Sequence, residues 1–423
     1  MERLAAGVRE QAESPRSARS IPVNLGIDFG TSSTKIVARL PYEAGTPAFA
    51  VPVPASARAE GHPHLWASQL WLTREGAFSL APASGAPAFC AMKAALMRDD
   101  GDRAIALHCA PWAATAMEAA TAFLALQIRQ ARGWLLTRQQ AAFAAGILRW
   151  SYHVGFPAAS LDREDLRRRY AAVCTAARDL SRMQGALTMD LVRAALGSAP
   201  TTQEELERRG IALVPEISAA VAGFANSTKR DNGLYALVDV GAGTVDCCTF
   251  GLGDWREEGE IGCPIFMADV AMLGVEPWRS CQDDAELAAF FEKKVAEQQR
   301  GVIWDTRQRR HRSSERWRTG LPVFLLGGGA ASDMHRRVTA GLDAWLRRSI
   351  RDGGGARVRA LSVPEEELRF DCRKEETHRL AVAFGLSFPF GEIPKAELPR
   401  SIDDDVPARR RDIEASYVSK EMT

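Results

Sequence analysis

Two short segments of the chain combine an acidic residue, glycines and hydroxyl residues: residues 26–35 (GIDFGTSSTK) and residues 238–246 (VDVGAGTVD). Glycine lets main-chain N–H groups come close to an oxyanion, and Ser or Thr hydroxyls add further donors. A carboxylate at the end of each preceding strand, Asp28 or Asp239, could hold Mg²⁺ through its waters. Two such turns facing one another would bind a polyphosphate from both sides.

The predicted elements place both segments at strand–turn–strand units, over residues 23–40 and 234–249. A strand at 322–326 precedes three glycines that open a helix, which Ser332 or Asp333 would cap and which runs to about Arg351. The second half of the chain thus repeats the pattern of the first. The other main elements that we predict are helices at 114–132, 162–180, 187–195, 215–225, 285–299 and 377–388, a hairpin at 66–78, and strands at 150–156 and 358–363.

Length and composition are those of an ordinary globular protein. The 423 residues exceed the usual size of one core, so we expect two lobes. Lys plus Arg (54) nearly balance Asp plus Glu (53), which argues against nucleic acid or an anionic membrane as a partner. No export signal or membrane span is evident, and the eight cysteines form no C-x-x-C motif. We therefore expect a cytoplasmic protein with reduced thiols.

The expected organisation has four parts. Residues 1–20 are a disordered lead-in, 21–213 the first lobe, 214–390 the second lobe, and 391–423 a C-terminal tail. Within the second lobe, the helix at 377–388 is expected to pack back toward the first lobe.

Five segments, in this order, resemble the actin, 70-kDa heat-shock chaperone (DnaK-type) and sugar-kinase superfamily of ATPases, and most of all the chaperone ATPase domain. Residues 26–35 and 239–246 resemble its two phosphate loops, and His153–Pro157 falls where the chaperones have a strand ending in Val-Pro-Ala. The other two segments are 214–222 (VPEISAAVA), which resembles the first connecting helix, and 323–330 (VFLLGGGA), which resembles the adenosine motif and is followed by 382–385 (VAFG) as a second connecting helix. Over residues 21–390 the resemblance implies an α/β, two-lobed actin-like (ribonuclease H-like) fold with a nucleotide cleft between the lobes.

The resemblance also implies a role for each matching residue, with ATP or ADP and Mg²⁺ as cofactors. Asp28 and Asp239 would hold Mg²⁺ through water, while Asp239, Glu216 and Thr244 would act in catalysis by positioning the attacking water and the phosphates. The nucleotide-binding residues would be Gly30, Thr31, Ser32, Gly241, Gly243 and Thr244 at the phosphates, and Gly327, Gly328 and Gly329 at the ribose and adenine.

Two candidate residues keep a second interpretation. Glu216 follows Pro215, so it could be only a carboxylate that the dipole of a helix start favours. The family reaches the phosphates with a lysine of the first lobe, and Lys93 is the only lysine between Lys35 and Lys229. The residues around Lys93 resemble a neighbouring helix of the family more than its catalytic loop.

The chain departs from the chaperones in three places. Only 88 residues separate Asp239 from Gly327, which predicts a reduced upper subdomain in the second lobe. Ala331 stands where the chaperones tend to carry an arginine that stacks on adenine. Only 33 residues follow position 390, too few for the chaperones' peptide-binding domain.

We therefore expect a chaperone-like protein in which Mg-ATP binding and slow hydrolysis open and close two lobes to regulate a protein partner. A small-molecule kinase of the sugar-kinase branch would need a general-base Asp between the lobes, for which the sequence offers no strong candidate. A filament-forming protein of the actin branch is the third interpretation. The arginine run at 307–312 is more typical of a solvated loop than of a nucleic-acid site.

Overall fold

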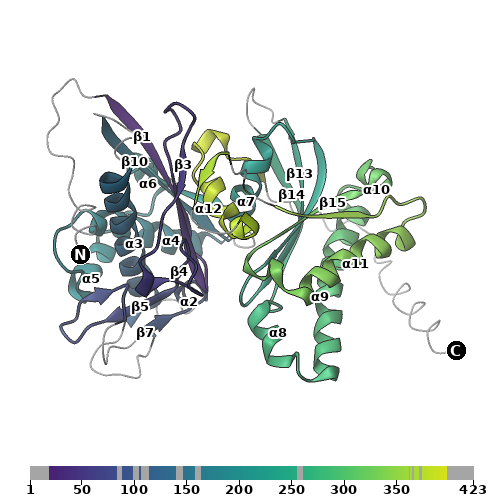
Figure 1. Cartoon of the computed structure of the whole chain (residues 1–423), viewed down its shortest axis with the longest axis horizontal. Helices are drawn as coiled ribbons and strands as arrows, with labels where there is room; N and C mark the ends of the chain where they lie inside the picture. Colours follow the sequence, from purple (N-terminus) through teal and green to yellow (C-terminus); the bar gives the residue numbers. More distant parts are fainter. Residues whose placement is uncertain are drawn as a thin grey trace.

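The computed structural model describes residues 19–82, 88–98, 104–105, 114–139, 146–157, 163–254, 261–361, 363, 366–370 and 374–397. Most of the predicted lead-in and of the predicted tail lies outside these residues. The described chain is an α/β protein built on two large mixed sheets (Figure 1).

Seven strands form the first sheet. They are β1 (Ser20–Asp28), β2 (Ser33–Arg39), β3 (Ala48–Ala50), β4 (Trp66–Ala67), β10 (Ile147–Phe156), β11 (Ile211–Pro215) and β17 (Leu368–Arg369). Their order is β11-β10-β1-β2-β3-β17, and β4 pairs with β2. β1, β2 and β3 are antiparallel neighbours, whereas β10 runs parallel to β1 and β11 parallel to β10.

Six strands form the second sheet in the order β16-β15-β12-β13-β14-β18. They are β12 (Gly233–Val240), β13 (Val245–Asp254), β14 (Ile261–Ala271), β15 (Leu321–Leu326), β16 (Ala356–Ala360) and β18 (Lys395–Glu397). β12, β13 and β14 are antiparallel, and β15 and β16 continue parallel to β12. The first five strands in the order of each sheet therefore follow one topology, and the predicted repetition between the two halves of the chain is confirmed.

Helices and sheets alternate in five layers (Figure 1). α3 and α4 cover the outer face of the first sheet, α7 and α12 lie between the sheets, and α9 and α11 cover the far face of the second sheet. The bounds are α3 (Ala116–Arg138), α4 (Glu164–Ser181), α7 (Glu216–Ala225), α9 (Ala285–Asp305), α11 (Asp333–Ser349) and α12 (Ala381–Leu386). α3 begins at a capping box, in which Thr115 and Glu118 bond each other's backbone N–H groups.

Glycines let the middle layer approach its neighbours closely. A Cβ at Gly385 of α12 would lie 1.7 Å from the Ala219 carbonyl oxygen of α7. A Cβ at Gly26 of β1 would lie 2.3 Å from the Ala383 carbonyl oxygen of α12. α7 and α12 share one hydrophobic core with the inner faces of both sheets, so this layer joins the two halves of the molecule.

The alternation of side chains along the strands sorts residues between the layers. In β1 and β2, Leu25 and Ile36 pack with the outer helices, whereas Val37 packs toward the middle layer. In β13 the adjacent Cys247 and Cys248 belong to different cores, as the predicted strand requires. By the same alternation, Asp28 and Lys35 of the first sheet, and Asp239 and Asp246 of the second, lie on the faces that the sheets turn toward each other.

The smaller elements lie mostly around the first sheet and in the stretch between Asp239 and Gly327. They are η1 (Ala55–Ala57), β5 (Gln69–Leu72), β6 (Phe78–Ser79), β7 (Ala88–Cys90), α2 (Met92–Leu96), β8 (Ala104–Ile105), β9 (Ala114–Thr115), α5 (Met189–Gly197), α6 (Gln203–Arg208), α8 (Val275–Cys281), η4 (Thr306–Arg310), α10 (Arg316–Thr319), η5 (Gly328–Ala331) and η7 (Phe390–Glu392).

Two predicted helices differ in detail from those observed. The helix expected at 377–388 is divided into a 3-10 helix, η6 (Lys374–Leu380), and α12. α11 begins after Ser332 as expected, but the Ser332 side chain does not cap it. Its hydroxyl lies 2.9 Å from Nδ1 of His335 instead. None of the helices in the described ranges is both long and apolar enough to cross a membrane.

Candidate functional site

The two predicted hairpins place a carboxylate at the same structural position in each sheet. Asp28 ends β1 and faces Lys35 across the hairpin, with the Lys35 ammonium 3.0 Å from the Asp28 carboxylate. Asp239, one residue before the end of β12, faces Asp246 across the second hairpin. One hairpin therefore presents an ion pair, whereas the other presents two like charges, an unfavourable cross-strand combination.

The acidic pair of the second hairpin holds its protons unusually tightly. Burial, followed by the Asp28 and Glu216 carboxylates, raises the pKa of Asp239 to about 7. Burial also raises the pKa of Asp246 to about 7, with Asp239 as the next cause. The Oδ1 atom of Asp246 is buried without a hydrogen bond. Such a group of carboxylates favours the binding of a proton or a metal cation.

Glu216 enters this group from the first residue of α7. Its carboxylate forms an ion pair of 2.5 Å with the ammonium of Lys93, which is buried in α2. α2 follows Ala91, whose φ of 51° is left-handed. Burial lowers the pKa of Lys93, but Glu216, followed by Tyr170 and Asp28, raises it above its ordinary value. Lys93 therefore stays charged, and the prediction of a helix around it is confirmed.

The turn of the first hairpin is held from behind and leaves its hydroxyls available. The Ser68 hydroxyl donates to the carbonyl of Gly30 at 2.7 Å, and the Ser68 N–H donates to the carbonyl of Ser32 at 3.0 Å. The Thr31 side chain is half-buried and that of Ser32 is exposed, and neither hydroxyl bonds another described residue. Both can donate to a ligand.

The turn of the second hairpin is closed by the Gly241 N–H, which donates to the Thr244 carbonyl at 2.8 Å. The start of α8 supports it, because the Gly274 N–H donates to the Gly243 carbonyl at 3.1 Å. A Cβ at Gly274 would lie 2.5 Å from the Ala242 carbonyl oxygen, so this contact requires glycine. The Thr244 hydroxyl bonds no other described residue.

The glycine triplet after β15 borders the acidic pair. Gly327 has a φ of +84°, and a Cβ there would lie 2.1 Å from Oδ1 of Asp239. Gly329 packs against Val240. A Cβ at Gly328 would lie 3.4 Å from a guanidinium nitrogen of Arg379. Only glycine allows this turn to pass so close to the Asp239 carboxylate.

The structure brings four of the predicted residues into one electrostatic group or into direct proximity: Asp28, Glu216, Asp239 and Gly327. The two turns at 30–32 and 241–244 make no hydrogen bond or ion pair with each other among the described residues. In the same residues, no group of three or more His, Cys, Asp or Glu side chains is arranged to hold a metal directly.

Sequence reasoning gave no role to two residues of this group, Lys35 and Asp246. Both lie in the segments that were singled out, each directly across the hairpin from a predicted metal-binding Asp. Counting residues across each turn would have identified both pairs. The pairing of Lys93 with Glu216 had no such signal, because 123 residues separate them.

The site therefore combines carboxylates from both sheets, a buried ammonium, and glycine turns with available donors. No protein-family model matches this chain, and no curated protein matches it either.

Proposed function

We propose that this chain is an actin-like ATPase that binds Mg-ATP between its two sheets, hydrolyses it slowly and so regulates a protein partner. One observation carries the proposal. Two hairpins of matching topology present Asp28 and Asp239 on facing surfaces, and Asp239 lies against a glycine that no larger residue could replace. A nucleotide held there would contact both halves of the protein.

The residues present fit a magnesium ion and a polyphosphate. The raised pKa of Asp239 reflects burial and repulsion by neighbouring carboxylates, which a divalent cation would relieve. Mg²⁺ usually keeps several waters and takes one or two carboxylates in addition to phosphate oxygens. When bound, it would neutralise charge on the phosphates. Asp28 and Asp239 would hold its waters.

The remaining roles follow from charge and position. The hydroxyls of Thr31, Ser32 and Thr244 and the N–H groups of the glycine turns would donate to phosphate oxygens. Glu216, held by Lys93, would orient the attacking water together with Asp239. Catalysis of this kind consists of positioning and electrostatic stabilisation, with no covalent bond to the protein.

The middle layer supports the coupling of the nucleotide to a change in shape. Glu216 begins α7, and α7 crosses α12 at a contact that admits only glycine. A change in how Glu216 and Asp239 are held would therefore act on the helices that join the two sheets. A partner that prefers one arrangement would be bound or released as the nucleotide changes.

Calorimetry of ATP and ADP, with Mg²⁺ and with EDTA, tests the proposal. Wild type should bind both nucleotides more tightly with Mg²⁺, and Asp28→Asn should lose that metal-dependent gain. Asp190→Asn, a change at an exposed acid of α5, is the matched control and should bind as wild type does. The proposal fails if wild type binds neither nucleotide, or if Mg²⁺ has the same effect on Asp28→Asn as on wild type.

Turnover measurements separate the proposal from its two alternatives. ATP hydrolysis that only a protein stimulates would support the regulatory function. Hydrolysis that rises with a panel of sugars or polyols would favour a small-molecule kinase instead, and ATP-dependent pelleting at high concentration would favour a filament-forming protein.

A further inference from the structure

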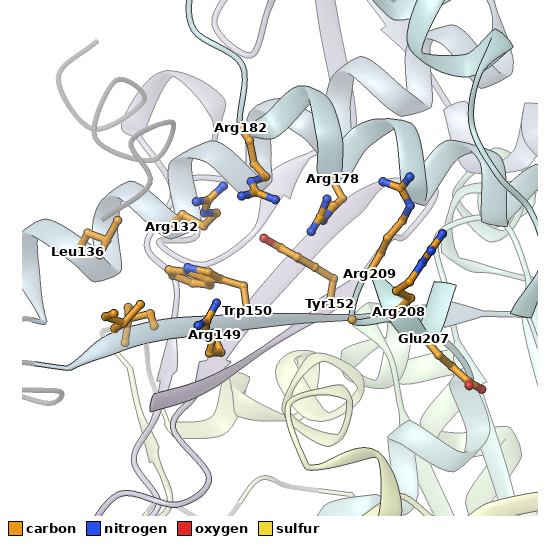
Figure 2. Close-up of a pocket in the computed structure, with 13 residues that line it drawn as sticks. Arg132, Leu136, Arg149, Trp150, Tyr152, Arg178, Arg182, Glu207, Arg208 and Arg209 are labelled. Carbon is orange, nitrogen blue, oxygen red and sulfur yellow. The ribbon is translucent and has the colours of Figure 1, made fainter. Parts of the chain in front are cut away.

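A pocket lies at the opposite end of β10 from the site described above. Near its end, β10 carries Gly155, which lies next to Glu216. Near its start, residues 147–150 and Tyr152 line a pocket of about 480 Å³, together with parts of α3, α4, α6 and the α6–β11 connection (Figure 2). The pocket opens there because β11 begins to pair with β10 only at Tyr152. This place is separate from the proposed nucleotide site.

The lining of this pocket is strongly basic. It contains one acidic residue, Glu207, and the arginines Arg132, Arg149, Arg178, Arg182, Arg208 and Arg209. Figure 2 shows Arg132, Arg178 and Arg182 gathered above Trp150 and Tyr152, while the Glu207 carboxylate points away from them. Arginine forks match the geometry of phosphate oxygens.

Arg132 is the clearest sign that the pocket takes an anion. Its side chain is 3% exposed, and its Nε and Nη1 atoms have no hydrogen-bond partner. Among the described residues, its guanidinium group contacts one aromatic ring, that of Trp150. The guanidinium carbon lies 5.3 Å from the centroid of this ring. Burial lowers the pKa of Arg132. A buried guanidinium with unused donors is costly, and an anionic ligand would satisfy it.

Other charges near the pocket are partly compensated within the protein. Asp179 accepts hydrogen bonds of 2.6 Å from both Arg178 and Arg209. Arg208 pairs with Glu205. Arg149, which is exposed, has no ion-pair partner among the described residues. Two arginines on neighbouring elements therefore remain uncompensated: Arg132 of α3, which is buried, and Arg149 of β10, which is exposed.

We propose that this pocket binds a small molecule carrying two or more phosphate groups. The uncompensated guanidinium groups of Arg132 and Arg149 set the minimum number of anionic groups. The volume is within the range of small-molecule sites, and the half-buried ring of Trp150 offers an apolar surface beside the charges. A nucleic acid would instead need a stripe of basic residues along an open face.

Calorimetry with inorganic tripolyphosphate in EDTA tests this site. Wild type should bind one equivalent. Arg149→Ala should bind about tenfold more weakly, because each hydrogen-bonded charge contributes about that factor or more. Arg132→Met should weaken binding further. Arg168→Ala, an exposed arginine of α4 outside the pocket, is the matched control and should bind as wild type does.

Two further measurements keep the outcome interpretable. Arg149 is exposed, so its variant should fold normally, and circular dichroism checks the fold of Arg132→Met. Thr244→Ala, changed at the proposed nucleotide site, should still bind tripolyphosphate. The proposal is overturned if wild type does not bind, if Arg149→Ala binds as wild type does, or if Thr244→Ala alone loses binding. It is also overturned if a single-stranded oligonucleotide binds more tightly than tripolyphosphate and displaces it.

Discussion

Asp239→Asn should stabilise the protein while weakening its binding of nucleotide. Asparagine has nearly the same shape as aspartate but carries no charge. In the folded protein without a metal, the pKa of Asp239 is raised from 3.8 to about 7 by burial and by the Asp28 and Glu216 carboxylates. The ionised side chain therefore opposes folding at neutral pH, and its removal relieves this cost.

The size and sign of the effect follow from that shift. A carboxyl group with a raised pKa in the folded state favours folding at low pH, and this contribution is lost as pH rises from about 4 to about 7. The rise in the pKa of Asp239 from 3.8 to about 7 corresponds to about 4 kcal/mol. Asp239 keeps partial contact with solvent, so we expect a gain of about 2 kcal/mol for Asp239→Asn at pH 8. The gain should shrink toward pH 4.

Urea unfolding in EDTA at pH 8 and pH 5, with calorimetry of Mg-ATP, measures both effects. Metal-dependent affinity should fall at least tenfold in Asp239→Asn, since a carboxylate that holds the waters of Mg²⁺ is lost. Asp190→Asn should leave Mg-ATP affinity unchanged and should alter stability by less than about 1 kcal/mol, since it removes one charge from the first turn of α5. An Asp239→Asn variant that is less stable than wild type at pH 8 would refute the electrostatic reasoning. An unchanged Mg-ATP affinity would refute the proposed role of Asp239.

Three further predictions concern the Lys93–Glu216 pair, the crossing of α7 and α12, and the buried histidine His62. Lys93→Met should lower the free energy of unfolding by about 3 kcal/mol, because it leaves Glu216 unpaired. Adding Glu216→Gln to the same chain should restore most of this loss. If the losses of the two single variants add up in the double variant, the two side chains are not directly coupled. Gly385→Ala should destabilise the protein by about 3 kcal/mol, because the new methyl group clashes with α7. Gly301→Ala, with open space around it, should stabilise the protein slightly. Equal melting temperatures of the two variants would contradict the tight crossing of α7 and α12. Burial lowers the pKa of His62 to about 4, so the free energy of unfolding should fall by about 1 to 2 kcal/mol from pH 7 to pH 5. Urea unfolding should show a smaller fall in His62→Gln. An equal fall in both proteins would show that His62 is not its cause.

Local chemistry made most of the strands and helices predictable. The apolar runs on both sides of the glycine turns predicted β1, β2, β12 and β13, and the long periodic segments predicted α3, α4 and α9. β14 was missed although it is 11 residues long, because strand formation depends on pairing with neighbouring strands more than on intrinsic propensity. The final helix was divided because short helices depend on tertiary contacts in the same way. The capping role of Ser332 was wrong because its hydroxyl bonds His335 instead.

For the candidate site, the sequence determined which residues could do chemistry. Asp28 and Asp239 were identified from residue type and spacing, because anion-binding turns need glycine and metal sites need carboxylates. Glu216 and the Gly327 triplet were identified only through the resemblance to the chaperone ATPase domain. What the tertiary structure decided is the charge balance. The alternation of two facing sheets places the acidic groups together, and α2 brings the Lys93 ammonium to a carboxylate that is 123 residues away in the chain. Electrostatic energy depends on distance in space and on burial, and neither is a property of a local segment.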